Sequence, residues 1–177
     1  IIPFGGGVVT KDIKEGCSIL LKWAEQLKVK YGEALGDQAD EQKVVTIPGN
    51  NGWEPKEISF RSLAFIVQAR MEEIIDAVSF QIEKAIQSEN LGAGIIITGG
   101  TSKLYNIIPL IKFRTGMDAR IAHPVFLPVN EKKQFQNPDY FTALGLLKLK
   151  LKHSNGFEKP GRKRETKKKE GNGFPFL

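Results

Sequence analysis

The chain has 177 residues, of which 41% are hydrophobic and 26% are charged, so we expect a globular fold with a buried core. No apolar run approaches the roughly 20 residues that a bilayer-spanning helix needs, and no signal-peptide pattern opens the chain. The single cysteine, Cys17, excludes an internal disulfide and favours a reducing cytosol. Two isolated histidines argue against a structural zinc site.

The net charge of +6 is unevenly distributed. Residues 153–177 contribute +4 of it, because seven Lys or Arg stand there against three Glu. This basic tail has too few apolar residues to pack, so we expect it to be disordered. A nucleic-acid-binding module that uses the tail is one alternative for function, although the charge would then lie outside the folded surface.

The N-terminal stretch predicts a strand, a loop and a short helix. Residues 1–4 are typical of the end of a buried strand, and Gly5–Gly7 of a loop. Thr10 and Asp12 precede a short helical segment and are candidate caps for it. The start of that helix is therefore expected after residue 10.

A second helix and a strand pair follow. Ser18 is a candidate cap for a helix that Gly32 ends, and apolar residues recur within it at helical spacing (Leu20, Leu21, Ala24, Leu27, Tyr31). After a polar loop at residues 36–41, "KVVTI" and "EISF" predict two strands joined by a turn rich in Gly, Asn and Pro.

The second half alternates helices with strands. A long amphipathic helix is predicted from Ser62 to about Asn90, followed by "GIIIT", whose unbroken apolar run favours a strand buried on both faces. A helix at residues 105–113, a strand in "DARIAHP" that Pro124 ends and a last helix at residues 140–150 complete the pattern.

This order of elements predicts an α/β core that carries a small α+β subdomain. We assign residues 1–17 and 90–152 to the core, residues 18–89 to the inserted subdomain and residues 153–177 to the tail.

The segment "TGGTSK" directly follows the "GIIIT" strand. Ligands of open α/β sheets bind beyond the carboxyl ends of strands, where Thr98, Gly99 and Gly100 fall. Glycines there would let a purine and its ribose lie against the main chain, and the following helix start would offer free N–H groups. An ordinary tight turn is the alternative explanation.

Three further motifs occur with this segment: "IPFGGGVVTKDI", "WAEQLKVKYG" and "PDYFTALGLLKL". In this order, with a long helix before the TGG, residues 1–151 resemble the second half of an actin-like ATPase. Within that superfamily, they most resemble the FtsA family of bacterial cell-division proteins. The resemblance implies the second large domain of an actin-like (ribonuclease H-like) fold, with its inserted subdomain.

The resemblance implies a set of adenosine-binding residues after the strand. Thr98, Gly99 and Gly100 match the adenosine motif, Ser102 follows it, and Lys103 takes the place of a basic residue that lies over the adenine. A cation with an aliphatic stem suits such stacking. The alternative for Lys103 is an exposed lysine in the first turn of a helix.

Glu25 and Lys28 match the family pair that reaches the ribose and the adenine from the smaller subdomain. At positions i and i+3 they share one helix face, where Glu can accept from ribose hydroxyls and Lys can donate. A solvated surface pair is the alternative. The cofactor implied is ATP.

The resemblance places the loop around the β- and γ-phosphates upstream of Ile1, so Gly5–Gly7 would be a structural turn near the cleft. We expect Mg²⁺ to be held mainly by an N-terminal half that this sequence does not contain. No catalytic or metal-binding residue is therefore assigned, and the chain by itself is not expected to hydrolyse ATP.

A second candidate site concerns a protein partner. Arg70 matches an arginine in the region where FtsA-like proteins receive the acidic C-terminal peptide of the tubulin-like protein FtsZ, and Lys56 lies in the approach to it. Arginine–carboxylate pairing suits an acidic peptide. An intrachain salt bridge is the alternative for Arg70.

The resemblance implies an ATP-binding actin homologue that polymerises and, together with other division proteins, tethers FtsZ filaments to the cytoplasmic membrane at the division septum. The glycines and Pro175 oppose a helical membrane anchor in the tail, which favours electrostatic attraction to anionic lipid. No specific nucleic acid is implied. Another actin-like protein, of the pilus-assembly or shape-determining type, is the remaining alternative.

Overall fold

The computed structural model of the chain describes residues 1–49, 52, 54–85, 92–123 and 137–155. The chain divides into two compact units, Ile1–Thr142 and Ala143–Leu177, and each is described by itself below. The first unit holds every sequence-predicted site residue.

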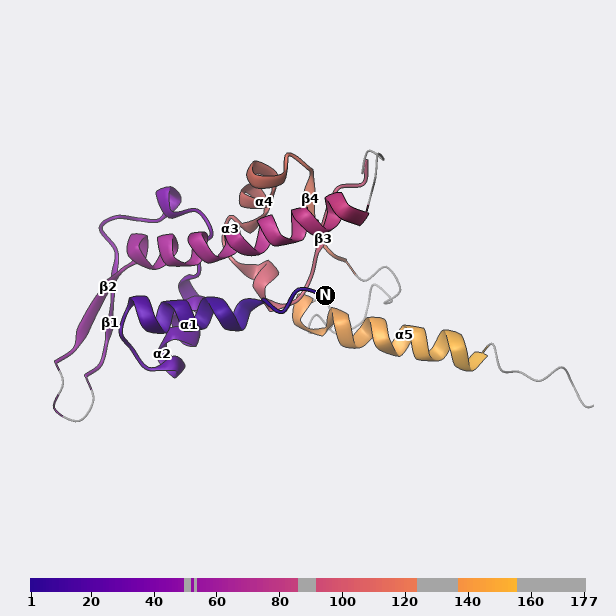
Figure 1. Cartoon of the computed structure of the whole chain (residues 1–177). Coiled ribbons are helices and arrows are strands. Elements are labelled where there is room, and N and C mark those ends of the chain that lie inside the picture. Colours follow the sequence, from indigo (N-terminus) through magenta and orange to yellow (C-terminus); the bar gives the residue numbers. More distant parts are fainter. Residues whose placement is uncertain (50–51, 53, 86–91, 124–136, 156–177) are drawn as a thin grey trace, which may run out of the picture. The chain divides into compact units, whose positions relative to one another are not determined.

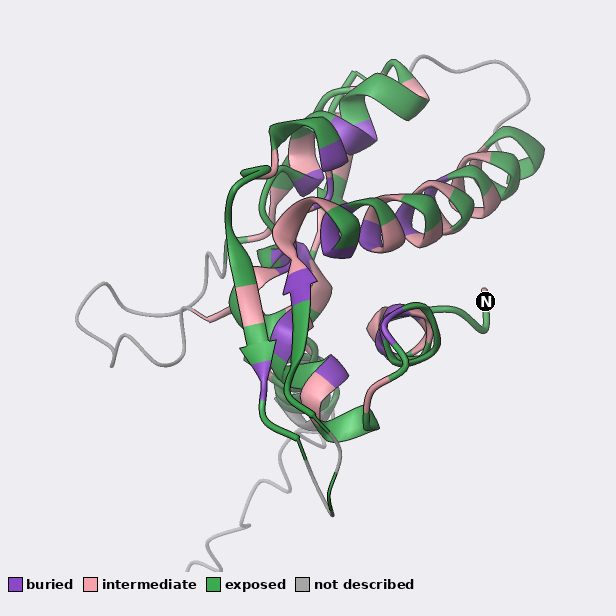
Figure 2. Cartoon of the chain, turned by 90° about the vertical axis from the view of Figure 1, so that its left-hand side faces the viewer, coloured by how far each residue is buried: buried purple, intermediate pink, exposed green. Residues whose placement is uncertain are grey.

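Three helices form the centre of the first unit: α1 (Gly6–Gly16), α2 (Leu21–Tyr31) and α3 (Phe60–Ala85). Helix α1 packs against both of the others, as Figure 1 shows. Its buried face meets a buried stripe on α3, and these faces supply most of the largest fully buried side chains (Val9, Ile13, Leu63 and Val67). Purple segments recur along α3 in Figure 2, as expected for an amphipathic helix.

A hairpin precedes α3. Strands β1 (Val44–Ile47) and β2 (Lys56–Ser59) pair antiparallel, with Val45 opposite Ile58, and β2 leads directly into α3. The predicted strand pair and most of the predicted long helix are thus confirmed. Residues 86–90 of that helix lie outside the described residues.

The second half of the unit contains a strand–helix–strand segment. Strand β3 (Ile95–Ile97) pairs parallel with β4 (Ala119–Ile121), and η2 (Gly100–Lys103) and α4 (Ile107–Thr115) connect them. Ile95 and Ile97 pack against the core, whereas Ile96 is 50% exposed. The prediction of a strand buried on both faces was wrong here. Successive side chains of a strand point to opposite faces, and the described residues cover only the face of β3 that carries Ile95 and Ile97.

The first residues also differ from the prediction. Residues 1–4 form no strand, and α1 begins at Gly6 within the predicted loop, so Thr10 lies inside the helix rather than at its cap. A Cβ at Gly6 would lie 2.5 Å from Thr101 Oγ1, so glycine at this position lets the first turn of the helix lie close to η2. Ser18 is not a cap either, since the α2 cap residue is Leu20.

The C-terminal elements are η4 (Pro138–Tyr140) and α5 (Phe141–Asn155). Helix α5 confirms the predicted last helix and extends three residues into the predicted tail. Residues 156–177 and Pro124 lie outside the described residues. Among the helices that the structure describes, none is long and apolar enough to cross a bilayer. The division into core and inserted subdomain stays a prediction.

Candidate functional site

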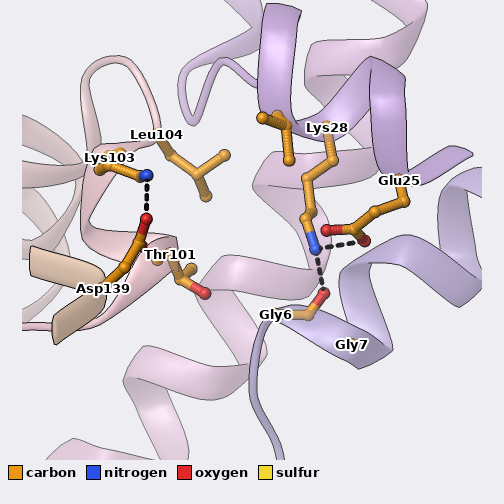
Figure 3. Close-up of a pocket in the computed structure, with 10 residues that line it drawn as sticks. Gly6, Gly7, Glu25, Lys28, Thr101, Lys103, Leu104 and Asp139 are labelled. Carbon is orange, nitrogen blue, oxygen red and sulfur yellow. Dashed lines mark hydrogen bonds and ion pairs between the residues drawn. The ribbon is translucent and has the colours of Figure 1, made fainter. Parts of the chain in front are cut away.

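A cavity of about 370 Å³ opens between the first turn of α1, the exposed face of α2, and the turns η2 and η4. Its volume lies in the range of small-molecule sites. Figure 3 shows side chains from both walls pointing toward this space. The lining residues are Gly6, Gly7, Glu25, Lys28, Val29, Gly100, Thr101, Lys103, Leu104 and Asp139.

Helix α2 supplies one wall through Glu25 and Lys28. Lys28 Nζ donates to Glu25 Oε2 at 2.7 Å and to the carbonyl oxygen of Gly6 at 3.0 Å, and its side chain is only 13% exposed. Burial alone would raise the pKa of Glu25, but the hydrogen bonds from Lys28 and Thr10 and the charge of Lys28 outweigh it, so this pKa is lowered. The pair is therefore a fixed ammonium beside an ionised carboxylate.

The opposite wall comes from η2 and η4. Lys103 Nζ lies 2.6 Å from Asp139 Oδ2, and both side chains are partly exposed. Gly100 belongs to the same wall, where a Cβ would come within 3.1 Å of Asp139 Oδ1. Leu104 adds an apolar surface to this otherwise polar wall. The cavity thus lies between two lysine–carboxylate pairs, one on each side (Figure 3).

The two walls are joined directly by backbone hydrogen bonds where α2 ends. Tyr105 N donates to Gly32 O at 3.0 Å, and Ala34 N donates to Tyr105 O at 2.8 Å. A Cβ at Gly32 would lie 2.3 Å from Lys28 O and 2.4 Å from Leu104 Cδ2. Glycine at this position therefore lets the end of α2 approach Leu104 at the end of η2.

The predicted adenosine-binding residues divide into two groups. Four of them line the cavity together: Glu25 and Lys28 from α2, and Gly100 and Lys103 from η2, a segment far from α2 in the sequence. The lining does not include Thr98, Gly99 or Ser102.

Gly99 and Ser102 instead shape the turn η2, which forms part of the opposite wall. Gly99 has φ 86° and ψ 176°, a backbone conformation that is essentially restricted to glycine. Ser102 is buried and its hydroxyl donates to the Gly99 carbonyl oxygen at 2.7 Å. Thr98 is exposed at the end of β3.

Sequence reasoning missed four polar or glycine positions of the lining. Gly6 and Gly7 stand in a visible Gly-Gly-Gly motif, for which the sequence favours a structural turn. Thr101 lies inside the "TGGTSK" segment, but nothing in that segment singles it out. Asp139 has no local signal, since only the folded chain brings it to Lys103, 36 residues away.

The predicted partner-binding residues lie elsewhere. Arg70 makes a bidentate salt bridge to Asp12 of α1, at 2.5 Å and 3.0 Å, and a third contact to Glu73 at 2.6 Å. The intrachain salt bridge considered for Arg70 is thus present. Lys56 is exposed at the start of β2, where its charge partly offsets the rise that burial causes in the pKa of the Cys17 thiol.

Comparison with known proteins decides the family. The family model described as "Cell division protein FtsA" matches residues 1–145. The chain belongs to the FtsA family. Among curated relatives, the cell division protein FtsA of Pseudomonas aeruginosa is 31% identical over 157 residues, and that of Escherichia coli K12 is 30% identical over 164 residues. Each match covers 88% of this chain.

This FtsA family chain spans 37% of the length of the first of these relatives and 39% of the second. Two solved structures show its fold. The structures of MreB5 of Spiroplasma citri bound to ADP and to AMPPNP align with TM-scores of 0.69 and 0.61, at 18% and 20% identity. They cover 90% and 88% of this chain, and 48% and 47% of their own chains are matched. The predicted α/β, actin-like fold is confirmed.

Proposed function

We propose that the cavity binds the adenosine part of ATP and that this FtsA family chain forms the adenosine side of the nucleotide site. The main support is the convergence of Glu25 and Lys28 with Gly100 and Lys103 on one cavity of nucleoside-binding size. The similarity to MreB5, solved with ADP and with AMPPNP, agrees with a fold that can hold such a ligand.

The geometry suggests how the α2 wall would act. The hydrogen bonds that Glu25 accepts from Thr10 and Lys28 both use Oε2, and Oε1 makes no hydrogen bond to the described residues. Oε1 can therefore accept from a ribose hydroxyl without breaking an existing bond. Lys28 already donates to three partners, so its role is to hold Glu25 and the start of α1 in place.

The other wall would hold the base. The aliphatic stem of Lys103 and the side chain of Leu104 offer an apolar surface beside the glycine turn, where a purine can stack. Asp139 fixes the ammonium of Lys103 and so limits the positions of that stem. Mg²⁺ and the phosphates would be held mainly by an N-terminal half, and this chain by itself would not hydrolyse ATP.

The test is the affinity of the full-length protein for ATP, measured by calorimetry. Glu25→Ala removes the ribose acceptor, and loss of a hydrogen bond to a charged group is expected to weaken binding about tenfold or more. Glu15→Ala is the matched control, because Glu15 is an exposed carboxylate on α1 outside the cavity lining. Equal ATP affinity of Glu25→Ala and wild type, with both folded, would remove Glu25 from the site.

The wider role rests on the family. We propose that the full-length protein polymerises like actin and, with other division proteins, links FtsZ filaments to the cytoplasmic face of the inner membrane at the septum. Arg70 and Lys56 would receive the acidic C-terminal peptide of FtsZ. For Arg70 this requires that the peptide carboxylate replace or join Asp12, its present partner.

A further inference from the structure

Thr10 of α1 has a buried hydroxyl that contacts both charged residues of the α2 wall, Glu25 and Lys28. It is 4% exposed, lies inside α1 and is not among the residues that line the cavity. Its Oγ1 is 2.7 Å from Lys28 Nζ, 2.5 Å from Glu25 Oε2 and 3.1 Å from the Gly6 carbonyl oxygen. A single side chain thus contacts both members of the predicted ribose-binding pair.

The protons of this cluster can be assigned. An ammonium group has three donors and no acceptor, and those of Lys28 go to Gly6 O, Thr10 Oγ1 and Glu25 Oε2. Thr10 Oγ1 therefore accepts from Lys28 and must direct its own proton to another partner. Glu25 Oε2 is the nearer of its two acceptors and carries the charge.

This assignment has a consequence for Glu25. Its Oε2 accepts two hydrogen bonds, from Lys28 and from Thr10, which fix the rotation of the carboxylate. Glu25 is on the surface, with a side chain 50% exposed, so the Lys28 contact alone would leave it free to exchange rotamers in water. The second contact comes from a buried residue on another helix, which limits that exchange.

We propose that Thr10 is a positioning residue for nucleotide binding: its hydroxyl holds Glu25 so that Oε1 faces the ribose. The inference rests on the proposed function. Thr10 itself does not touch the nucleotide and acts through Glu25. Loss of the hydroxyl should therefore weaken the recognition of the ribose specifically, rather than all nucleotide contacts equally.

The experiment compares the affinities of the full-length protein for ATP, 2′-deoxy-ATP and 3′-deoxy-ATP. Wild type is expected to bind ATP about tenfold or more tightly than at least one deoxy analogue, because Glu25 then lacks a donor. Thr10→Val keeps the side-chain shape and removes the hydroxyl. It should lower ATP affinity and bring the ratio of the affinities for ATP and for that deoxy analogue close to one. Thr10→Ser restores the hydroxyl and should retain the ratio.

The matched control is Thr115→Val. Like Thr10, Thr115 is a helical threonine whose Oγ1 lies within hydrogen-bond distance of the carbonyl oxygen four residues earlier, but it lies on α4 outside the cavity lining. This variant should bind all three nucleotides as wild type does. Circular dichroism checks folding, and Thr10→Ala replaces Thr10→Val if the latter does not fold.

The outcomes separate this inference from the proposed function. If wild type binds ATP and discriminates against a deoxy analogue, but the Thr10 variants without a hydroxyl keep the same ratio, the positioning role is wrong and the nucleotide site stands. A uniform loss of affinity for all three nucleotides also overturns it, since that indicates a structural role alone. Failure of wild type to bind ATP overturns both.

Discussion

Gly32 is a residue outside the cavity lining at which the two walls of the site come into contact. It ends α2, and its carbonyl oxygen accepts from Tyr105 N. Its φ of −64° is open to any residue, so conformational freedom is not the reason for glycine here. The reason is space, because the Lys28 carbonyl oxygen and the Leu104 side chain leave no room for a Cβ.

Gly32→Ala is accordingly expected to lower the free energy of unfolding by about 1–3 kcal/mol, as overpacked substitutions do. It should also weaken nucleotide binding, because α2 and η2 must separate to admit the methyl group. Urea unfolding followed by circular dichroism measures the first effect. Gly92→Ala is the control, since no atom lies within 4 Å of a Cβ there; equal loss in both variants would contradict the packing argument.

At the scale of elements, α1 is held on two sides by polar contacts in addition to its buried face. Arg70 of α3 pairs with Asp12 in the second half of α1, and Lys28 of α2 bonds Gly6 at its beginning. Both contacts position α1 between the other two helices. Arg70 therefore serves the fold whether or not it also binds a peptide.

A charge exchange separates these two roles of Arg70. Arg70→Glu places like charges together, so it should lower the melting temperature, and it should weaken binding of the C-terminal FtsZ peptide at least tenfold. Asp12→Lys combined with Arg70→Glu restores an ion pair and should recover stability but not peptide binding. Fluorescence anisotropy with labelled peptide gives the affinity; normal binding by the double variant would limit Arg70 to its structural role.

At the scale of the whole molecule, the positive charge is concentrated near the C-terminus. Residues 156–177 carry seven Lys or Arg and three Glu, and so a net charge of +4. Such a segment is attracted to anionic surfaces within a Debye length, at roughly 1 kcal/mol for each basic residue near the lipid. This charge is the basis for the proposed weak attachment to the membrane.

Deletion of residues 156–177 should therefore reduce binding of the full-length protein to phosphatidylserine-containing vesicles at least tenfold, with ATP affinity unchanged. Vesicle sedimentation at about 50 and about 300 mM salt measures the effect, which should shrink as salt rises. Neutral vesicles serve as the control. If the deletion variant binds anionic vesicles as wild type does but no longer binds duplex DNA, the result would instead favour the nucleic-acid alternative.

Local patterns in the sequence, together with the family motifs, were sufficient for most elements and for four of the ten residues that line the cavity. The β1–β2 hairpin, α3 and α4 follow from apolar periodicity and turn residues, which act over a few neighbouring positions. Glu25 and Lys28 were found because an i, i+3 spacing on a helix and a family motif coincide. The family itself was evident from the order of the motifs.

Tertiary structure decided the features that depend on contacts between distant segments. The close approach of Gly6 to Thr101 and the Lys103–Asp139 pair depend on how η2 and η4 fold back toward the helices. The contacts of Thr10 with Glu25 and Lys28 depend on the packing of α1 against α2. None of these has a local signal, because each partner is chosen by the packing of separate helices and turns. The sequence alone determined which groups were available for a nucleotide, and the packing determined which of them share one cavity.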